Sequence, residues 1–246
     1  MSPWRLQRHA ALPSTSDLCV ERARAGEPEG LAVLALRQTA GRGSRGRAWE
    51  SPPGALCFSV LLRPQEPATA SGHWALLAAL ALHDALSPLA RPGALSLKWP
   101  NDVLIAGCEA GGREAGARKL GGILLDAAWG AEGLEWLVIG FGANLAGAPE
   151  GAGALGAAPE PGRAAEGVLD ALDRWRRARL LEGWAPVRAA WLARAHPAGT
   201  ALRVRSGARE AAGAFAGLAE DGALLLRTAE RVRAFPTGDV LLGLGG

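Results

Sequence analysis

The chain has 246 residues, of which 49% are hydrophobic and 21% are charged, and its formal net charge is +3. This length allows one large domain, or a medium domain joined to a small one, and the apolar fraction excludes a wholly disordered chain. The slight basic excess fits anionic small molecules or weak contact with nucleic acid, but it is too small to require either.

The first predicted element is a helix over residues 13–26. Ser14 can cap this helix, Asp17 occupies the capping-box position, and Gly26 can end it. The apolar stretch 71–90 has the length and composition of a well-buried helix. Short apolar runs bounded by turn residues predict strands at 31–36, 55–62, 95–99, 103–105, 120–129 and 134–145.

The second half of the chain changes character twice. Residues 163–195 carry helical patterns that are interrupted at Pro186. Beyond them, short alternating segments separated by Gly and Asp-Gly turns predict a small all-β unit. The predicted organisation is therefore a mixed α and β domain over residues 1–196, followed by a small β domain over residues 197–246.

The stretch RQTAGRGSRGRAW, residues 37–49, holds three glycines and three arginines between Gly41 and Arg47. Glycines let backbone amides approach an anion, and arginines offer planar forks for carboxylate or phosphate. A strand follows and Gly-Lys-Ser/Thr is missing, so this loop is not a P-loop. Its like charges and the lack of an apolar anchor predict mobility until an anion binds. Trp49 suits stacking on a base or sugar; the alternative is a solvated basic turn.

The stretch LSLKWPNDVLI places polar residues between two short strands. Pro100 cannot donate to a sheet, and Pro-Asn-Asp is strong turn chemistry. Lys98, Asn101 and Asp102 are therefore expected at one end of the sheet. These side chains either serve a site there or are solvated residues of a tight turn.

Two predicted strands carry glycines in place of side chains. Glycine weakens a strand unless something must approach its backbone closely. In KLGGILLD, a ligand can lie over Gly122 with its anionic end at Lys119. In VIGFGANL, Gly140 and Gly142 leave one face bare, and Asn144 can read an adenine edge. The alternative is a bulge where the sheet bends.

Other kinds of site are not predicted. The four histidines show no metal-ligand spacing, so no metal site is expected, and no Ser-His-Asp arrangement is evident. Three cysteines without close spacing predict a reducing cytoplasm rather than a disulfide framework. The N-terminal residues lack the apolar segment of a signal peptide, and the longest apolar run, 74–82, is too short to span a membrane.

Taken in order, several segments resemble biotin protein ligases. They are STS at 14–16, QTAGRGSRGRAWESPPGALCFSVLLRP at 38–64, KWPNDV at 98–103, KLGGILLD at 119–126 and IGFGANL at 139–145. The tail is similar to that family's C-terminal domain in GTALRV, GLAEDGALLL and TGDVLL. The resemblance covers most of the chain. It implies an α+β fold, in which a mixed β-sheet backed by helices is followed by a small C-terminal β-barrel.

The resemblance implies a two-step ligase reaction. Biotin and MgATP give biotinyl-5′-AMP and pyrophosphate, and a lysine amine of a carrier domain then displaces AMP. The expected partner is the biotin carboxyl carrier protein of acetyl-CoA carboxylase or a related carboxylase, in the cytoplasm. About a dozen residues precede Ser14, too few for a winged helix, so no specific DNA binding is expected. The expected state is a monomer or homodimer.

The resemblance also implies three sets of site residues. The catalytic set, in which Lys119 bridges the biotin carboxylate and the α-phosphate, is Lys119, Arg42, Arg45 and Asp102. The biotin-binding set is Ser14, Thr15, Ser16, Gln38, Gly41, Arg42, Gly43, Ser44, Lys119, Gly122 and Gly140. The nucleotide-binding set is Arg45, Arg47, Trp49, Asn101, Lys119 and Asn144. In the second step the carrier amine must lose a proton, and Asp102 is expected either to accept it or to orient the amine.

The sequence departs from the family at four places. Ser44 stands where a second loop arginine is often found, and Ser16 stands where asparagine is common. The segment between Asn101 and Lys119 is long, so the Gly/Ala-rich residues 106–118 are expected to be an inserted loop or hairpin. The tail lacks the basic residue that some members carry after Gly-Asp-Val, which puts a phosphate contact from the barrel in doubt.

Three alternatives remain open at the level of sequence. A lipoate or octanoate ligase of related architecture would also act on a carboxylic acid, but Gln38, Ser14 and the KWPND turn favour a ureido ring. A non-catalytic biotin or nucleotide sensor would not need Lys119 and the basic loop. A nucleic-acid-binding module would need a wider basic face than one loop supplies.

Overall fold

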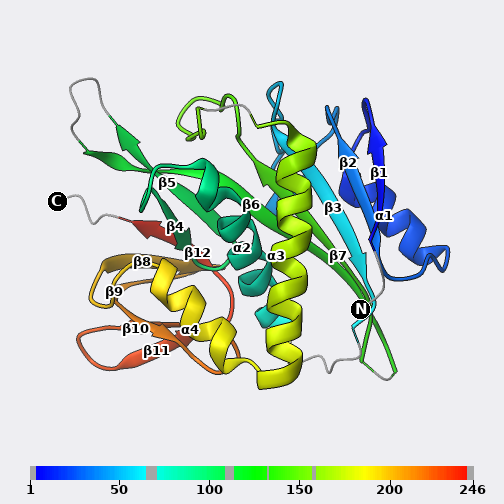
Figure 1. The fold of residues 1–246 in the computed structure, drawn as a ribbon. Helices are drawn as coiled ribbons and strands as arrows, with labels where there is room; N and C mark the ends of the chain where they lie inside the picture. Colours follow the sequence, from blue (N-terminus) through cyan, green and yellow to red (C-terminus); the bar gives the residue numbers. More distant parts are fainter. Residues whose placement is uncertain (1–3, 65–70, 109–113, 132, 157–158, 243–246) are drawn as a thin grey trace.

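The computed structural model describes residues 4–64, 71–108, 114–131, 133–156 and 159–242. Figure 1 shows a long twisted sheet with helices packed across it, and a smaller sheet beside one end. The predicted fold class is confirmed: a mixed sheet backed by helices is followed by a small all-β unit.

The large sheet has seven strands in the order β1-β2-β3-β7-β6-β5-β4. The β1–β2 pair is parallel and the other neighbours are antiparallel. The strands are β1 (Arg5–His9), β2 (Leu31–Ala35), β3 (Leu56–Leu62), β4 (Leu95–Lys98), β5 (Asp102–Cys108), β6 (Glu114–Gly130) and β7 (Gly133–Ala143).

Helices cover both faces of this sheet. The helix α1 (Thr15–Arg24) packs on β2, β3 and β7 from one side, while α2 (Ser71–Leu86), α3 (Pro161–Glu182) and α4 (Ala185–Arg194) form a layer on the other side. β3 is buried along its whole length because it lies between these layers. Phe58 on this strand belongs to the large core under α2 and α3, whereas Leu61 belongs to a small core under α1.

The C-terminal unit is a five-stranded antiparallel sheet in the order β11-β10-β9-β8-β12. Among the described residues β11 and β12 are its outer strands, so the unit is an open sheet rather than a closed barrel. Its inner face joins the same hydrophobic core as α2 and α4. The strands are β8 (Ala201–Ser206), β9 (Arg209–Leu218), β10 (Leu224–Arg227), β11 (Val232–Phe235) and β12 (Asp239–Leu242).

The structure differs from the sequence-based expectation in two places. β1 was not predicted, because its exposed, charged residues show no apolar pattern. The helical stretch is interrupted as predicted, but the break lies at residues 183–184, and Pro186 lies in the first turn of α4, where a missing N–H costs little.

The insertion expected at 106–118 is a hairpin rather than a loop. Residues 106–108 extend β5 and residues 114–118 extend β6, and residues 109–113 lie outside the described part of the chain.

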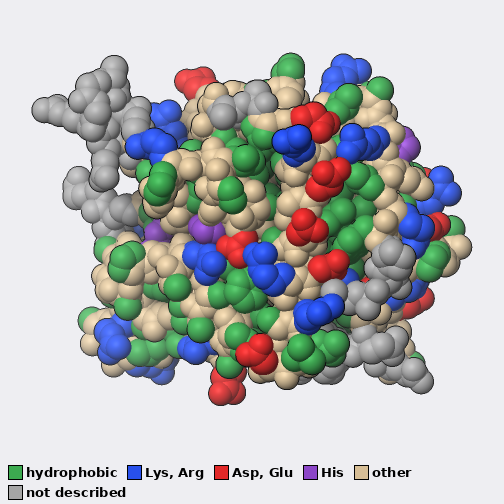
Figure 2. Space-filling view, in the orientation of Figure 1, with side chains coloured by type: hydrophobic (Ala, Val, Ile, Leu, Met, Phe, Trp, Pro, Cys, Tyr) green, Lys and Arg blue, Asp and Glu red, His purple; other side chains and the backbone are tan. Residues whose placement is uncertain are grey.

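The helical face of the molecule has a mixed charge distribution. Figure 2 shows acidic and basic side chains interspersed among apolar ones over α3 and its surroundings. Within the described ranges, no helix is long and apolar enough to cross a membrane.

Candidate active site

The pocket lies on the α1 side of the sheet, over strands β3, β7, β6 and β5. Directly paired residues of neighbouring strands lie on the same face of a sheet. One such row runs from Asp102 through Gly122 to Gly142, and the next runs from Leu124 through Gly140 to Ser59. The three glycines therefore leave the centre of this face without side chains, and polar side chains lie on either side of the centre. The pocket and the solvent-filled space at its mouth together occupy about 460 Å³.

One end of the pocket is a network of buried polar groups at the N-terminus of α1. Ser14 caps the helix by accepting a hydrogen bond from the backbone N–H of Asp17, which confirms the predicted cap. Gln38 Oε1 accepts hydrogen bonds from the Thr15 backbone N–H at 2.8 Å and from the Thr15 hydroxyl at 3.1 Å. The Ser59 hydroxyl lies 2.7 Å from Thr15 Oγ1 and 3.0 Å from the hydroxyl of the Ser16 side chain. These contacts orient donors and acceptors before any ligand arrives.

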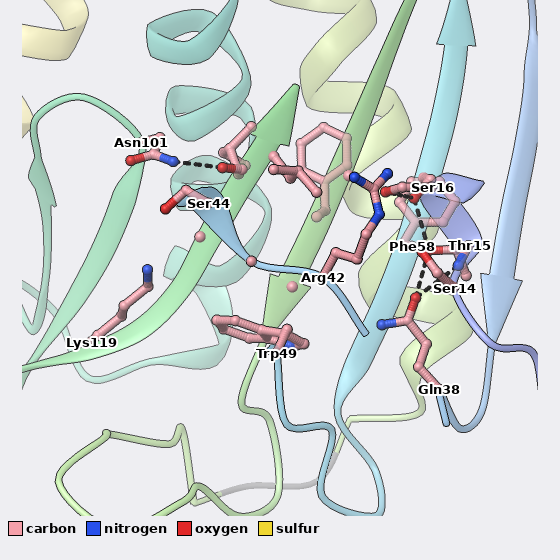
Figure 3. Close-up of a pocket in the computed structure, with 18 residues that line it drawn as sticks. Ser14, Thr15, Ser16, Gln38, Arg42, Ser44, Trp49, Phe58, Asn101 and Lys119 are labelled. Carbon is pink, nitrogen blue, oxygen red and sulfur yellow. Dashed lines mark hydrogen bonds between the residues drawn. The ribbon is translucent and has the colours of Figure 1, made fainter. Parts of the chain in front are cut away.

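The other end of the pocket is cationic. Lys119 Nζ lies 2.6 Å from Asp102 Oδ1, while Lys98 Nζ lies 2.9 Å from Asp102 Oδ2. The Lys119 ammonium is also 5.7 Å from the centre of the Trp49 ring. Figure 3 shows Lys119, Asn101 and Ser44 at one end, Gln38 with Ser14, Thr15 and Ser16 at the other, and Trp49 with Arg42 between them.

The Gly-Arg loop forms a tight hairpin over the pocket. The Trp49 N–H donates to Gly41 O at 2.9 Å and the Gly43 N–H donates to Arg47 O at 2.7 Å, with Arg45 in the left-handed region at its tip. A Cβ on Gly41 would lie 2.5 Å from Trp49 O, so the hairpin requires glycine there. The expectation that this loop lacks an anchor is wrong, because Trp49 lies against the bare backbone of β7 and two loop arginines, Arg42 and Arg45, are ion-paired.

The Arg42 guanidinium joins the loop to two other elements. Its Nε lies 2.7 Å from Asp17 Oδ1 on α1, and its Nη2 lies 2.8 Å from Asp126 Oδ2 on β6. Burial alone would lower the pKa of Arg42, but the hydrogen bond with Asp126 and the charge of Asp17 outweigh it and raise the pKa. Arg42 therefore remains cationic at the pocket wall.

A second pocket opens beside Trp49. Its lining includes Trp49, Lys119, Asn144, Pro149 and Ala152. Asn144 is buried; its Nδ2 donates to the carbonyl of residue 153 at 3.1 Å, and among the described residues its Oδ1 has no hydrogen-bond partner. An unpaired buried amide oxygen is unfavourable unless a ligand or water donates to it. Asn144 thus offers an acceptor to a group bound beside the indole ring.

Most of the predicted site residues line the first pocket, and the structure brings them together from five segments of the chain. The residues that line it are Ser14, Thr15, Ser16, Gln38, Arg42, Gly43, Ser44, Trp49, Asn101, Lys119, Gly122 and Gly140. Asn144 lines the second pocket instead. Asp102 lies behind Lys119, and Gly41 is at the base of the loop hairpin.

The structure does not bring Arg45 and Arg47 into the lining of either pocket. Arg45 is ion-paired with Asp239 of the C-terminal sheet, and Arg47 donates to the hydroxyl of Ser44 at 3.1 Å. Their roles towards nucleotide, and that of Arg45 in catalysis, stay predictions.

Several residues of the pocket were not predicted as site residues. Ser59 is fully buried in β3, and the signal that could have identified it is a lone hydroxyl in an otherwise apolar strand. Asp126 does not line the pocket but pairs with Arg42 at its wall; it follows KLGGILL directly, and its charge in a strand pattern was a comparable signal. The remaining unpredicted lining residues are Phe58, Ile123, Leu124, Phe141 and Gly142.

Across the part of the chain that the structure describes, no three His, Cys, Asp or Glu side chains are grouped as metal ligands. The polar groups that line the first pocket are hydroxyls, amides, an ammonium and a guanidinium over a bare sheet.

Comparison with known proteins gives a consistent result. Residues 10–144 match the biotin/lipoate A/B protein ligase family, and residues 199–243 match the biotin protein ligase C-terminal domain. A biotin–[acetyl-CoA-carboxylase] ligase of Paracoccus denitrificans is 41% identical over 226 residues, which are 86% of this chain and 90% of that protein. A ligase of the same description from Mycobacterium tuberculosis is 33% identical, covering 98% of this chain and 90% of that protein.

Other relatives are longer or differ more in sequence. A bifunctional ligase/repressor of Bacillus subtilis is 29% identical, and the match covers 96% of this chain but 73% of that protein. Among solved structures, the biotin protein ligase of Aquifex aeolicus in complex with biotin and ATP matches with a TM-score of 0.78 and 25% identity, covering 97% of this chain and 98% of that chain.

The two family matches together include every strand of both sheets except β1, and two relatives above 30% identity cover 86% and 98% of the chain. The chain therefore belongs to the biotin/lipoate A/B protein ligase family, within its biotin protein ligase branch.

Proposed function

We propose that this protein is a biotin protein ligase. It activates biotin with ATP to biotinyl-5′-AMP and transfers the biotinyl group to a lysine of a biotin carboxyl carrier domain. The observation that carries the proposal is the polarity of the pocket: a buried cluster of neutral donors and acceptors lies at one end and Lys119 at the other. A ureido ring suits the first end, and a carboxylate suits the second.

In the first step, an oxygen of the biotin carboxylate attacks the α-phosphorus of ATP. The bond between the α-phosphorus and the pyrophosphate oxygen breaks, and pyrophosphate leaves with its electron pair. Both reactants are anions, so their approach requires positive charge in fixed positions. Lys119 and Arg42 both line the pocket. Lys119 is proposed to contact both anions, and Arg42 is proposed to supply a second cation from the loop. ATP enters as the magnesium complex, and the metal belongs to the substrate.

The nucleotide is proposed to occupy the second pocket. The flat face of Trp49 suits an adenine ring, and Asn144 Oδ1 can accept a hydrogen bond from the exocyclic amine of adenine. Lys119 lines both pockets, which supports the proposal that it bridges the α-phosphate and the biotin carboxylate. The hairpin over this junction limits the access of water to a mixed anhydride that hydrolyses readily.

In the second step, the carrier amine attacks the acyl carbon and AMP leaves as the bond to its phosphate oxygen breaks. The amine must be neutral, and a free lysine with pKa ~10.4 costs roughly 4–5 kcal/mol to deprotonate at pH 7. Asp102 is the carboxylate nearest to Lys119, and it is proposed to receive this proton or to orient the amine. We propose the carrier of acetyl-CoA carboxylase or a related carboxylase as the substrate.

The experiment that tests this function is exchange of labelled pyrophosphate into ATP, with biotin, lipoate and octanoate in parallel. Exchange with biotin alone is the expected result. Exchange with lipoate or octanoate would instead place the protein among the related acyl ligases. Biotin binding without exchange would favour a sensor. A mobility-shift assay with a biotin-operon operator tests the further prediction that the protein binds no specific DNA.

A further inference from the structure

Lysine occurs at two positions in the chain, 98 and 119, whereas the other 25 of the 27 basic residues are arginine. The two lysines contact the same carboxylate. Lys98 binds Oδ2 of Asp102 and Lys119 binds Oδ1, at 2.9 and 2.6 Å. An ammonium binds one oxygen as a compact charge, whereas a guanidinium tends to take both oxygens of a carboxylate in parallel. Each lysine of the chain thus contacts one oxygen of the same carboxylate.

The backbone holds this arrangement in place. Lys98 ends β4 and Asp102 begins β5, and the two residues are directly paired across the turn between them. Asp102 is in turn paired with Gly122, whose bare face lies beneath the Lys119 ammonium. The side chains of Lys98 and Asp102 are 21% and 12% exposed, so solvent screens their contact only in part.

The groups around Lys98 indicate that its positive charge acts on the Asp102 carboxylate. His196 lies close enough for its pKa to be lowered, first by burial and then by the charge of Lys98. Lys98 therefore stands between an uncharged imidazole near pH 7 and the Asp102 carboxylate. It does not line either pocket, so it has no direct contact with a ligand there.

We propose that Lys98 is a positioning residue for adenylation: by occupying one oxygen of Asp102, it leaves only the other oxygen for Lys119. An ammonium has three N–H donors. With one donor on Asp102 Oδ1, two remain, one for the biotin carboxylate and one for the α-phosphate. The inference rests on the proposed function, which supplies those two anions.

The charge of the cluster leads to the same conclusion. Two ammonium groups and one carboxylate have a net charge of +1, which can stabilise two anions as they approach. Without Lys98 the pair of Lys119 and Asp102 is neutral, and both carboxylate oxygens are free to turn towards Lys119. Removal of Lys98 should therefore slow the reaction step and leave the binding of the ureido ring, at the other end of the pocket, unchanged.

The test begins with Lys98→Met in the full chain, which keeps the length of the stem and removes the ammonium. We expect the rate of biotin-dependent pyrophosphate exchange to fall by about tenfold or more, the scale for losing a partner that orients an active-site group. The dissociation constant for biotin should stay within about twofold, since ground-state binding is not changed. Exchange at the wild-type rate would overturn the proposal. Arg205→Met removes an ion pair with Glu210 in the C-terminal sheet and is the matched control.

Two further variants test the shared contact. In Lys98→Arg the guanidinium can still occupy one oxygen of Asp102, as pairs of arginines share the carboxylates of Asp84 and Glu210, so exchange should recover to within about threefold of wild type; a rate as low as that of Lys98→Met would contradict the division of the carboxylate. In an Asp102→Asn background, Lys98→Met should change exchange by less than about twofold, because the two residues act through one contact. A further tenfold loss there would show that Lys98 acts independently of Asp102.

An NMR measurement on the protein without substrate tests the positioning role of Lys98 separately from the proposed function. Protein labelled with [13C]lysine gives two side-chain Cε signals, since the chain has two lysines. We expect the Lys119 signal to shift in Lys98→Met and not in Arg205→Met. An unchanged Lys119 signal would overturn the positioning role. Absence of exchange in the wild-type protein would instead count against the proposed function.

Discussion

At the scale of single residues, the pocket combines side chains whose partners are already in place. Thr15 hydrogen-bonds to both Gln38 and Ser59, and Arg42 is bound to two carboxylates. Pre-formed partners reduce the entropy that ordering a site would cost on binding. Lys119 differs from these residues, because Asp102 is its one carboxylate partner among the described residues.

Lys119→Ala should therefore separate chemistry from binding. We expect the rate of adenylate formation to fall at least about 100-fold, as for the loss of one transition-state donor. The affinity for biotin should weaken less, because the hydroxyl and amide cluster at the other end is untouched. Pyrophosphate exchange and calorimetric titration with biotin measure the two effects. Unchanged exchange would remove Lys119 from the mechanism.

At the scale of elements, β7 places two glycines on the face that forms the floor of the pocket. A Cβ on Gly142 would lie 2.6 Å from the Trp49 ring, whereas a Cβ on Gly140 would lie 2.5 Å from the Ser16 hydroxyl. Gly142 therefore leaves room for the Trp49 indole, and Gly140 leaves room for the Ser16 hydroxyl. The indole and the polar cluster form two different walls of the pocket, and β7 sets the position of both.

Alanine at these two positions should have different effects. Overpacking costs typically 1–3 kcal/mol, and about 1.4 kcal/mol corresponds to tenfold in affinity. Gly142→Ala should raise the KM for ATP about tenfold because Trp49 is displaced, and Gly140→Ala should weaken biotin binding by a similar factor. Gly130→Ala, where a Cβ meets open space, is the control. If each variant changed the KM for ATP and the affinity for biotin by the same factor, the idea that the two glycines serve separate walls of the pocket would be contradicted.

The Asp84 carboxylate links the three helices of the helical layer, α2, α3 and α4. Asp84 of α2 receives hydrogen bonds from Arg174 and Trp175 of α3, and Arg194 of α4 lies 2.9 Å away. Burial alone would raise the pKa of Asp84. The hydrogen bond with His83 and the charge of Arg194 outweigh burial and lower the pKa from 3.8 to about 2.

This shift predicts how stability depends on pH. A carboxyl whose pKa is lowered by folding stabilises the native state above its unfolded pKa, and the contribution is lost as pH falls through the folded pKa. Asp84→Asn should therefore reduce the free energy of unfolding by about 2 kcal/mol at pH 7. The difference from wild type should disappear between about pH 4 and pH 2, the window set by the two pKa values. Urea unfolding across this range checks it, and a constant difference at every pH would contradict the assignment.

At the scale of the whole molecule, the two sheets share one core. Trp99 Nε1, next to the KWPND turn, donates to Gly222 O of the C-terminal unit at 3.0 Å, and the Arg188 guanidinium donates to Leu218 O. Arg45 in the ligand loop pairs with Asp239 on β12. The C-terminal sheet thus contacts both the turn that holds Asp102 and the loop that covers the pocket.

A shared core predicts cooperative unfolding. We expect a single calorimetric transition for the full chain, because separating the units would expose the buried faces of α2, α4 and β9. Residues 1–196 alone should melt at a lower temperature than the full chain. Two resolved transitions, or an unchanged melting temperature of the shorter chain, would show that the units fold independently and would support the proposed boundary as a true domain limit.

The sequence by itself determined the features that local chemistry controls. Ser14 capped its helix as predicted, most apolar runs became strands at their expected places, and motif order was enough to indicate the family. Local patterns cannot report which distant residues meet, since contacts such as Arg42 with Asp126 form only when loop and sheet pack together. The tertiary structure therefore decided three contacts: those of the Ser59 hydroxyl with Thr15 and Ser16, the pairing of Arg45 with Asp239, and the sharing of Asp102 by Lys98 and Lys119.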